Sequence, residues 1–89
     1  MASDIQVYGT DWCGLTNGVR RYLTAGHFEY DYFNIEHDQD AAEFVLAVNL
    51  GRRRLPVVVI VDCIVTNPTV AELRRLLDVQ GICPSRIPA

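Results

Sequence analysis

Residues 56–61 read Pro-Val-Val-Val-Ile-Val, and every position after the proline carries a β-branched aliphatic side chain. Such side chains favour the extended conformation. Because the run has no polar alternation, a strand built from it has no face suited to solvent. The sequence therefore predicts a central strand buried on both faces. Even with Leu55 included, the apolar run is far shorter than the roughly 20 residues of a membrane-spanning helix, so no membrane role is expected.

The first third of the chain switches between the periodicities of strands and helices. Residues 5–8 alternate as a strand does and stop at Gly9. From Leu15 onward apolar side chains recur at helical spacing, and Gly26 is suited to end that helix. Residues 29–35 alternate again. We therefore predict a strand, a helix and a second strand in this order.

A second helix is predicted before the central strand. Either Asp38 or Asp40 can cap its N-terminus, Glu43 is placed to close a capping box, and Gly51 marks its exit. The predicted inner face consists of Ala41, Phe44, Val45 and Val48.

After the central strand the chain turns at once and enters a third helix. Residues 62–63 suffice only for a tight turn, so residues 64–66 are predicted to return as a short strand. Asn67 is the predicted N-cap of the last helix and Pro68 its first residue. The predicted buried stripe of this helix is Val70, Leu73, Leu76 and Leu77.

The resulting order is β-α-β-α-β-β-α. A helix joins the first two strands, so they should be parallel with a right-handed crossover, whereas a tight turn joins the last two into an antiparallel hairpin. This is the topology of a thioredoxin-like α/β domain with a four-stranded mixed sheet and three helices. We assign residues 1–80 to this single domain. Residues 81–89, which contain two prolines and little periodicity, are expected to form a flexible C-terminal tail.

Charge and cysteine content argue against several functional classes. The net charge is −3 at pH 7, so neither nucleic acid nor an anionic membrane surface is an expected partner. The three cysteines are far apart and no histidine lies at ligand spacing, so no metal site is predicted. An odd cysteine count does not fit a secreted disulfide scaffold, and no secretory signal is readable. We expect a cytoplasmic monomer with reduced thiols.

The candidate catalytic residue is Cys13, which lies between the first strand and the first helix in the segment Trp12-Cys13-Gly14-Leu15-Thr16. A helix N-terminus favours thiolate over thiol, and the thiolate is the nucleophile of thiol–disulfide exchange. Gly14 leaves the sulfur open to a substrate. The alternative is a small buried cysteine without chemistry, but ligands bind at the carboxyl ends of strands in α/β sheets. We therefore predict that Cys13 is a nucleophile.

Residues 7–14, Val-Tyr-Gly-Thr-Asp-Trp-Cys-Gly, resemble the active-site entrance of the glutaredoxin-like proteins, and among them that of the mycoredoxins and the small redoxins that serve ribonucleotide reductase. The resemblance extends over about residues 5–77. It implies a glutaredoxin-type fold and a thiol-disulfide oxidoreductase. It also implies a low-molecular-weight thiol, mycothiol or glutathione, as co-substrate, with no tightly bound cofactor.

The resemblance gives roles to residues outside the Cys13 loop. It implies a cis bond before Pro56, so that the backbone of Leu55 is offered to a substrate beside Cys13. From the local sequence alone, a trans proline at the start of a strand is the commoner case.

Three polar residues are expected to contact the small thiol. Arg54 is chosen from the basic run 52–54, which otherwise reads as a solvated loop. Asn67 and Thr69 lie where the family begins its last helix near the bound thiol, although helix capping alone also explains them.

The chain departs from the family at Thr16, where the usual Cys-x-x-Cys motif has its second cysteine. We therefore predict a monothiol cycle, in which Cys13 takes the small thiol from a protein mixed disulfide and a second thiol molecule releases it. Thr16 either donates a hydrogen bond to the thiolate or merely fills the position. Trp12 either contacts partners or shields the loop. Cys83, in the tail, is a candidate substitute resolving thiol.

Two other functions remain as alternatives. If Thr16 marks a loss of turnover, the groove between Cys13 and Pro56 would serve as a redox-inactive binding module. An iron–sulfur carrier is the weaker alternative, because monothiol glutaredoxins of that kind have Cys-Gly-Phe-Ser and an upstream lysine, and this chain has no lysine. The favoured function has S-thiolated or disulfide-containing proteins as substrates.

Overall fold

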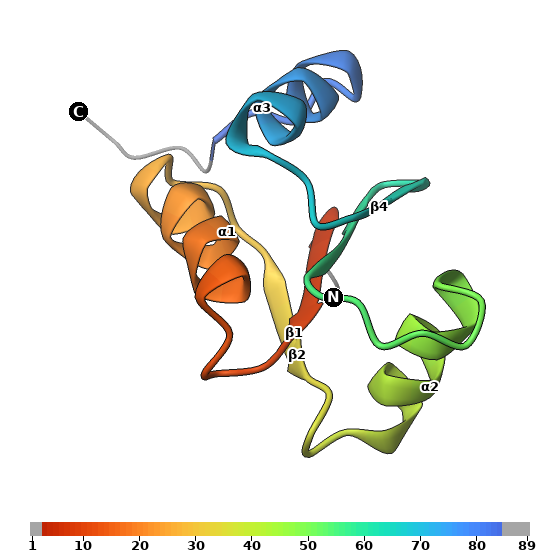
Figure 1. The fold of residues 1–89 in the computed structure, drawn as a ribbon. Coiled ribbons are helices and arrows are strands. Elements are labelled where there is room, and N and C mark those ends of the chain that lie inside the picture. The colour runs from red at the N-terminus through yellow and green to blue at the C-terminus, as the bar shows by residue number, and fades with distance from the viewer. Residues whose placement is uncertain (1–2, 85–89) are drawn as a thin grey trace.

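The computed structural model describes residues 3–84, which form four strands and three helices (Figure 1). In chain order these are β1 (Ile5–Gly9), α1 (Gly14–Ala25), β2 (Asp31–Asn34), α2 (Gln39–Val48), β3 (Val57–Ile60), β4 (Cys63–Thr66) and α3 (Val70–Val79). The predicted order β-α-β-α-β-β-α is confirmed. The second strand is shorter than the predicted range 29–35.

The strands form one mixed sheet in the order β2-β1-β3-β4. β1 and β2 are parallel, as predicted, whereas β3 runs antiparallel to both β1 and β4. β3 therefore has a neighbour on each side. Its residues Val57, Val58 and Ile60 are fully buried although they lie on opposite faces of the strand. The prediction of a central strand buried on both faces is confirmed.

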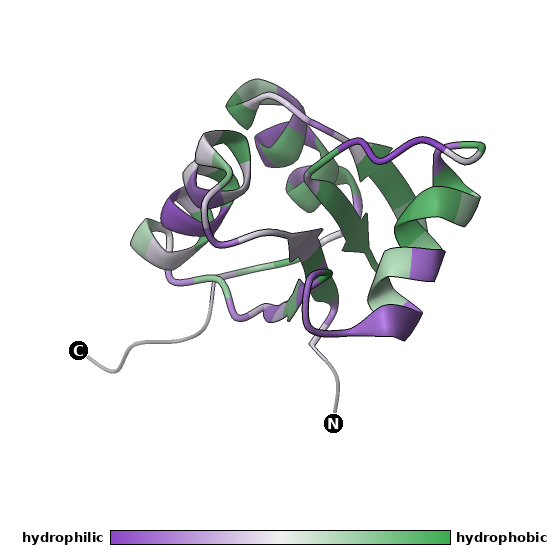
Figure 2. Ribbon diagram, turned by 60° about the horizontal axis from the view of Figure 1, so that its bottom comes forward, coloured by the Kyte–Doolittle hydropathy of each residue, from purple (hydrophilic) through white to green (hydrophobic). Residues whose placement is uncertain are grey.

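Helices cover both faces of the sheet and give three layers. The buried core between the sheet and helices α1 and α3 consists of Ile5, Val7, Val19, Leu23, Val58, Ile60, Leu73 and Leu77. The smaller core beneath α2 consists of Ile35, Ala41, Val45 and Val57. Figure 2 shows hydrophobic strands in the middle of the molecule, flanked by helices that are partly hydrophilic. The protein thus has two hydrophobic cores, one on each face of the sheet.

The start of α3 differs from the sequence prediction. Asn67 is not the N-cap and Pro68 is not the first helical residue; the N-cap is Thr69. The Thr69 hydroxyl accepts a hydrogen bond from the Glu72 N–H, and the Glu72 carboxylate accepts one from the Thr69 N–H. This reciprocal capping box satisfies two N–H groups, whereas Asn67 would satisfy one. Asn67 instead adopts a left-handed backbone conformation, with φ of 50°.

At α2 the structure selects between the two predicted caps. Asp38 is the N-cap, and its carboxylate accepts a hydrogen bond from the N–H of Ala41 at 3.0 Å. Glu43 consequently lies two positions too late for a capping box and accepts a hydrogen bond from Gln39 instead. The predicted end of α1 at Gly26 is confirmed.

Beyond α3 the chain keeps contact with the core for a few residues. The N–H of Ile82 donates to the carbonyl of Leu77, and the Ile82 side chain packs against the core beneath α1 and α3. Residues 85–89 of the predicted tail lie outside the described residues. Within residues 3–84, every helix is too short or too polar to cross a membrane.

Candidate active site

The sheet register brings the predicted site segments to one edge. Tyr8 near the end of β1 pairs with Val57 at the start of β3, and Val57 also pairs with Thr66 at the end of β4. The loop after β1, the Leu55-Pro56 segment and the turn after β4 therefore emerge side by side. The Asn67 N–H donates to the Pro56 carbonyl at 2.6 Å and joins two of these segments directly. The Leu55-Pro56 bond is cis.

Cys13 is the N-cap of α1 and is partly exposed. Partial burial of the sulfur by itself raises the pKa of its thiol. The Thr16 hydroxyl and the backbone N–H groups of Thr16 and Leu15 act in the opposite direction and prevail, so the Cys13 pKa lies below its ordinary value. The first turn of α1 has no acidic residue to oppose them. Cys13 is thus suited to be a thiolate nucleophile.

Thr16 is fully buried against β1. Its hydroxyl has no partner of normal hydrogen-bond geometry among the described residues, the Cys13 sulfur included. It is nevertheless close enough to stabilise the negative charge of the thiolate. The space that Thr16 occupies exists because residue 9 is glycine: a Cβ there would lie 2.3 Å from Thr16 Oγ1 and 2.4 Å from its Cγ2. Gly9 and Thr16 therefore fit only as a pair.

We expect Thr16→Val to lower the reactivity of Cys13 and to raise the stability of the protein. Valine keeps the shape of threonine but lacks the hydroxyl that lowers the Cys13 pKa, so the midpoint of Cys13 alkylation should move to higher pH. The contact is weaker than a hydrogen bond of normal geometry to a charged group, which is worth about 1.5–3 kcal/mol. Since solvent screens this one, the alkylation rate at neutral pH should fall about two- to tenfold. Removal of a buried, unpaired hydroxyl should at the same time raise the free energy of unfolding by about 1 kcal/mol.

Rates of Cys13 alkylation against pH, with Cys63 and Cys83 replaced by serine, measure the first effect, and urea unfolding measures the second. An unchanged midpoint in Thr16→Val would show that the backbone N–H groups alone activate Cys13.

The loop that carries Cys13 is fastened to its neighbours through Asp11. The Asp11 carboxylate accepts a hydrogen bond from the Tyr32 hydroxyl at 2.8 Å and lies 3.9 Å from the Arg20 guanidinium, which in turn stacks on the Tyr32 ring. The Asp11 carbonyl accepts a hydrogen bond from Asn17. Burial, followed by the hydrogen bond to Asp11, raises the pKa of Tyr32 to about 12. Tyr32 therefore remains a hydrogen-bond donor throughout the physiological pH range.

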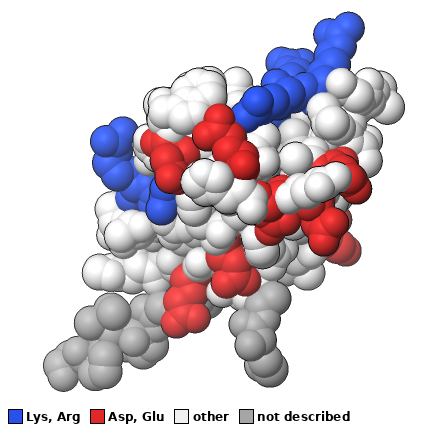
Figure 3. Space-filling model, turned by 90° about the horizontal axis from the view of Figure 1, so that it is seen from below, with Lys and Arg blue, Asp and Glu red and all other residues white. Residues whose placement is uncertain are grey.

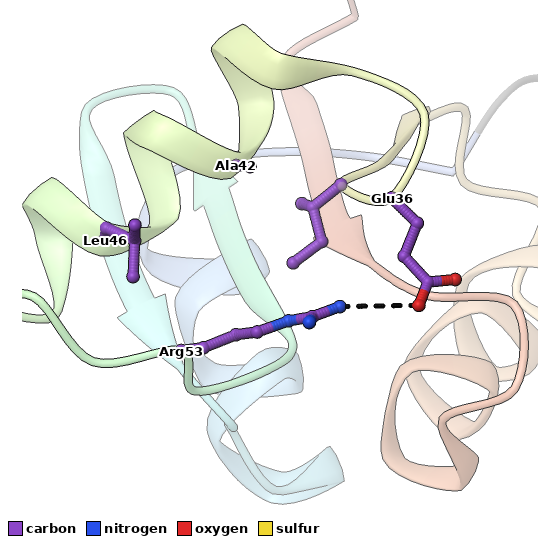
Figure 4. Close-up of a pocket in the computed structure, with 5 residues that line it drawn as sticks. Glu36, Ala42, Leu46 and Arg53 are labelled. Atoms are coloured by element: carbon purple, nitrogen blue, oxygen red, sulfur yellow. Dashed lines mark ion pairs between the residues drawn. The ribbon is translucent and has the colours of Figure 1, made fainter.

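The sequence analysis missed two residues beside Trp12. The indole Nε1 of Trp12, whose side chain is 70% exposed, donates a hydrogen bond to the Glu36 carboxylate at 3.0 Å. The same carboxylate oxygen lies 3.6 Å from the guanidinium of Arg53 (Figure 4). Glu36 directly follows the β2 region, and parallel strands end at the same edge of a sheet. That position was the available sequence signal for Glu36.

Glu36 and Arg53 form the rim of a pocket of about 370 Å³. Its other lining residues are apolar: Ile35, Ala42 and Leu46. The predicted ligand contact Arg54 lies elsewhere, with Arg52, at a second pocket that Val48, Asn49 and Leu50 complete. Of the three successive arginines, the middle one is therefore linked through Glu36 to the Cys13 loop.

The other predicted contacts differ in how many of their polar groups are free. Among the described residues, the backbone N–H and C=O of Leu55 and the side chain of Asn67 have no hydrogen-bond partner. In the capping box the Thr69 N–H donates to Glu72 and the Thr69 hydroxyl oxygen accepts from Glu72, which leaves the hydroxyl hydrogen as the donor that Thr69 can offer to a ligand. Gly14 is exposed, and a Cβ placed on it would meet no atom within 4 Å.

Cys83 does not lie beside Cys13 in the described structure. Figure 1 shows the chain leaving α3 near the C-terminal end of α1, whereas Cys13 caps the opposite end. A helix of 12 residues is about 18 Å long at about 1.5 Å per residue. All three cysteines are free thiols, and residues 3–84 contain no cluster of three or more metal-binding side chains.

Comparisons with known proteins identify the family of this chain. The family model described as Glutaredoxin matches residues 5–65. A candidate glutaredoxin from Mycobacterium tuberculosis is 39% identical over 79 residues, which cover 86% of this chain and 94% of the relative. Mycoredoxin 1 of Corynebacterium glutamicum is 36% identical over 72 residues, or 80% of this chain and 89% of the relative. Among solved structures, a mutant of a thioredoxin-like protein has a TM-score of 0.75 at 25% identity and covers 85% of this chain and 96% of its own.

Proposed function

Because the chain belongs to the glutaredoxin family, we propose that it is a monothiol thiol–disulfide oxidoreductase that removes low-molecular-weight thiols from proteins. The observation that carries the proposal is the environment of Cys13. Its thiol has a lowered pKa at the N-terminus of α1, and Thr16 occupies the position of a resolving cysteine. The site therefore has one activated sulfur and no second sulfur within the motif.

The first step transfers the small thiol to the enzyme. The Cys13 thiolate attacks the small-thiol sulfur of a protein mixed disulfide, so a new disulfide forms between Cys13 and the small thiol while the protein leaves as a thiolate. Helix N–H groups that favour the Cys13 thiolate also make Cys13 a better leaving group in the next step.

The second step regenerates the enzyme. A second small-thiol molecule, as thiolate, attacks its counterpart on Cys13, which releases the symmetrical small-thiol disulfide and restores the Cys13 thiolate. We assign the bound thiol to this edge of the sheet, where the backbone groups of Leu55 and the side chain of Asn67 have no hydrogen-bond partner among residues 3–84. Thr69 contributes the start of α3 and the hydrogen of its hydroxyl as a donor.

The chemical class of the partner follows from the family. The relative named mycoredoxin 1 suggests mycothiol, and the family as a whole suggests glutathione. Either acts as a co-substrate, and S-thiolated proteins are the substrates. We further propose that the protein acts as a monomer in the cytoplasm, and that residues 1–80 form the functional domain.

The proposal is tested by trapping the intermediate. The protein is mixed with a peptide disulfide of mycothiol or of glutathione, quenched with acid and analysed by mass spectrometry. We expect one small thiol on Cys13 together with free peptide thiol. Absence of the adduct with both thiols would contradict the proposal and favour a redox-inactive binding module.

The matched variant Thr16→Cys supplies the second sulfur of the usual motif. Because residue 16 lies within one turn of Cys13, we expect this variant to convert the adduct into an internal disulfide and to release the small thiol. The mass of the quenched protein then falls back to two hydrogens below that of the reduced form. Persistence of the adduct in Thr16→Cys would show that side chain 16 cannot reach Cys13.

A further inference from the structure

The Glu36 carboxylate links the Cys13 loop to the only arginine of the run 52–54 that lies near it. It accepts the Trp12 indole N–H at 3.0 Å and pairs with the Arg53 guanidinium at 3.6 Å. Figure 4 shows the Arg53 side chain extended toward Glu36, with both residues lining the pocket. The positive charge that an anionic ligand would seek here is therefore already paired within the protein.

The surroundings of this pair are unfavourable for a further negative charge. Asp11 lies in the loop before Cys13, and Asp38 and Asp40 begin α2 directly after Glu36. Figure 3 views the molecule from the side of these loops and shows acidic side chains across the middle, with arginines toward two edges. Arg20, in α1, is engaged with Asp11 and Tyr32, and Arg52 and Arg54 line a separate pocket.

The interior of the pocket suits an uncharged group. Ile35, Ala42 and Leu46 line it below the Glu36–Arg53 pair. A carboxylate that entered would compete with Glu36 for the Arg53 guanidinium and would lie close to the Glu36 charge. An uncharged group meets neither penalty, because the pair at the rim stays intact.

We propose that Glu36 is a specificity-determining residue that selects for small thiols without a carboxylate, by keeping Arg53 paired. This inference rests on the proposed thiol-transfer function. The preferred co-substrate is then an uncharged polar thiol. Acidic thiols such as glutathione are poorer co-substrates.

The test uses two probe thiols of similar shape that differ in charge, mercaptoacetate and mercaptoacetamide, each joined by a disulfide to the same fluorescent peptide. The rate constant for peptide release is measured for the wild-type protein and for Glu36→Gln. Glutamine can still accept the Trp12 indole hydrogen bond through its amide oxygen, so only the charge is lost. We expect the ratio of the mercaptoacetate rate to the mercaptoacetamide rate to rise about two- to tenfold in Glu36→Gln, as befits a partly exposed ion pair.

Two further variants test whether the Glu36–Arg53 pair causes this change in the rate ratio. Glu43→Gln removes the same charge from the exposed surface of α2, where Glu43 pairs with Gln39 and not with Arg53, and should leave the ratio unchanged. Adding Arg53→Gln to Glu36→Gln should abolish the gain, and raising the salt concentration should diminish it. An unchanged ratio in Glu36→Gln, or an equal rise in Glu43→Gln, overturns the inference. Failure of both probes to react with the wild-type protein would instead overturn the proposed function.

Discussion

Replacement of Cys13 by serine is expected to lower thiol transfer by about a thousandfold or more, down to the uncatalysed background. A serine hydroxyl does not ionise near neutral pH and forms no disulfide, so both steps of the proposed cycle lose their reacting atom. The fold should survive, because Cys13 makes no side-chain capping hydrogen bond at the start of α1. Peptide release from a small-thiol mixed disulfide gives the rate, and circular dichroism checks the fold.

The other two cysteines give internal controls for this experiment. Cys63 begins β4, away from the site, and Cys63→Ser should keep the activity of the wild-type protein. Cys83→Ser tests the predicted substitute resolving thiol: if Cys83 has that role, the adduct on Cys13 accumulates and turnover falls. Full activity of Cys13→Ser would refute the assignment of the nucleophile.

The second large effect, a loss of stability, is expected for a substitution at Gly9, a residue that has no reactive side chain. In Gly9→Ala the new Cβ would lie 2.3, 2.4 and 2.9 Å from Oγ1, Cγ2 and Cβ of Thr16. Neither partner can yield easily, because Gly9 is in the sheet and Thr16 is fully buried in α1. We expect a loss of about 3 kcal/mol, at the upper end of the usual range for overpacking. The corresponding fall in Tm is about 10–25 °C.

A double-mutant cycle identifies the cause of that loss. Thr16→Ala removes two of the three close atoms, so Gly9→Ala should cost less than half as much in that background. The matched control is Gly18→Ala, which has open space around the new Cβ and lies within α1. It should stabilise the protein by about 0.5–1 kcal/mol. Thermal or urea unfolding measures the four proteins of the cycle and the control, and an equal cost of Gly9→Ala in both backgrounds would exclude the contact with Thr16.

The same pair of residues connects stability with reactivity. In Gly9→Ala, α1 can relieve the overlap only by moving its first turn away from β1, which carries the N–H groups of Leu15 and Thr16 with it. These groups lower the Cys13 pKa, so the alkylation midpoint should also rise. Gly18→Ala leaves the first turn in place and should not shift it.

Several features of this protein were determined by local sequence. The aliphatic residues 57–60 have no polar face and became a buried strand, whereas Val61, at the end of the same run, lies in the turn and is exposed. The alternation between strand and helix periodicities determined the element order. Cys13 lies at a strand-to-helix junction, so its position at a helix N-terminus also followed from neighbours along the chain. Each of these properties depends on residues within about ten positions of one another.

The remaining features depended on contacts between distant segments. Glu36 acquires its role because the ends of β2 and β1 meet at one edge and bring it to Trp12, 24 positions earlier. Arg53 differs from Arg52 and Arg54 only by the direction that the loop gives it. The start of α3 lies at Thr69 and not at Asn67 because Asn67, bonded to Pro56 across the β3–β4 hairpin, has a φ of 50° and not the extended conformation of an N-cap. Periodicity carries no information about such contacts, since their energy depends on segments that only the folded sheet brings together.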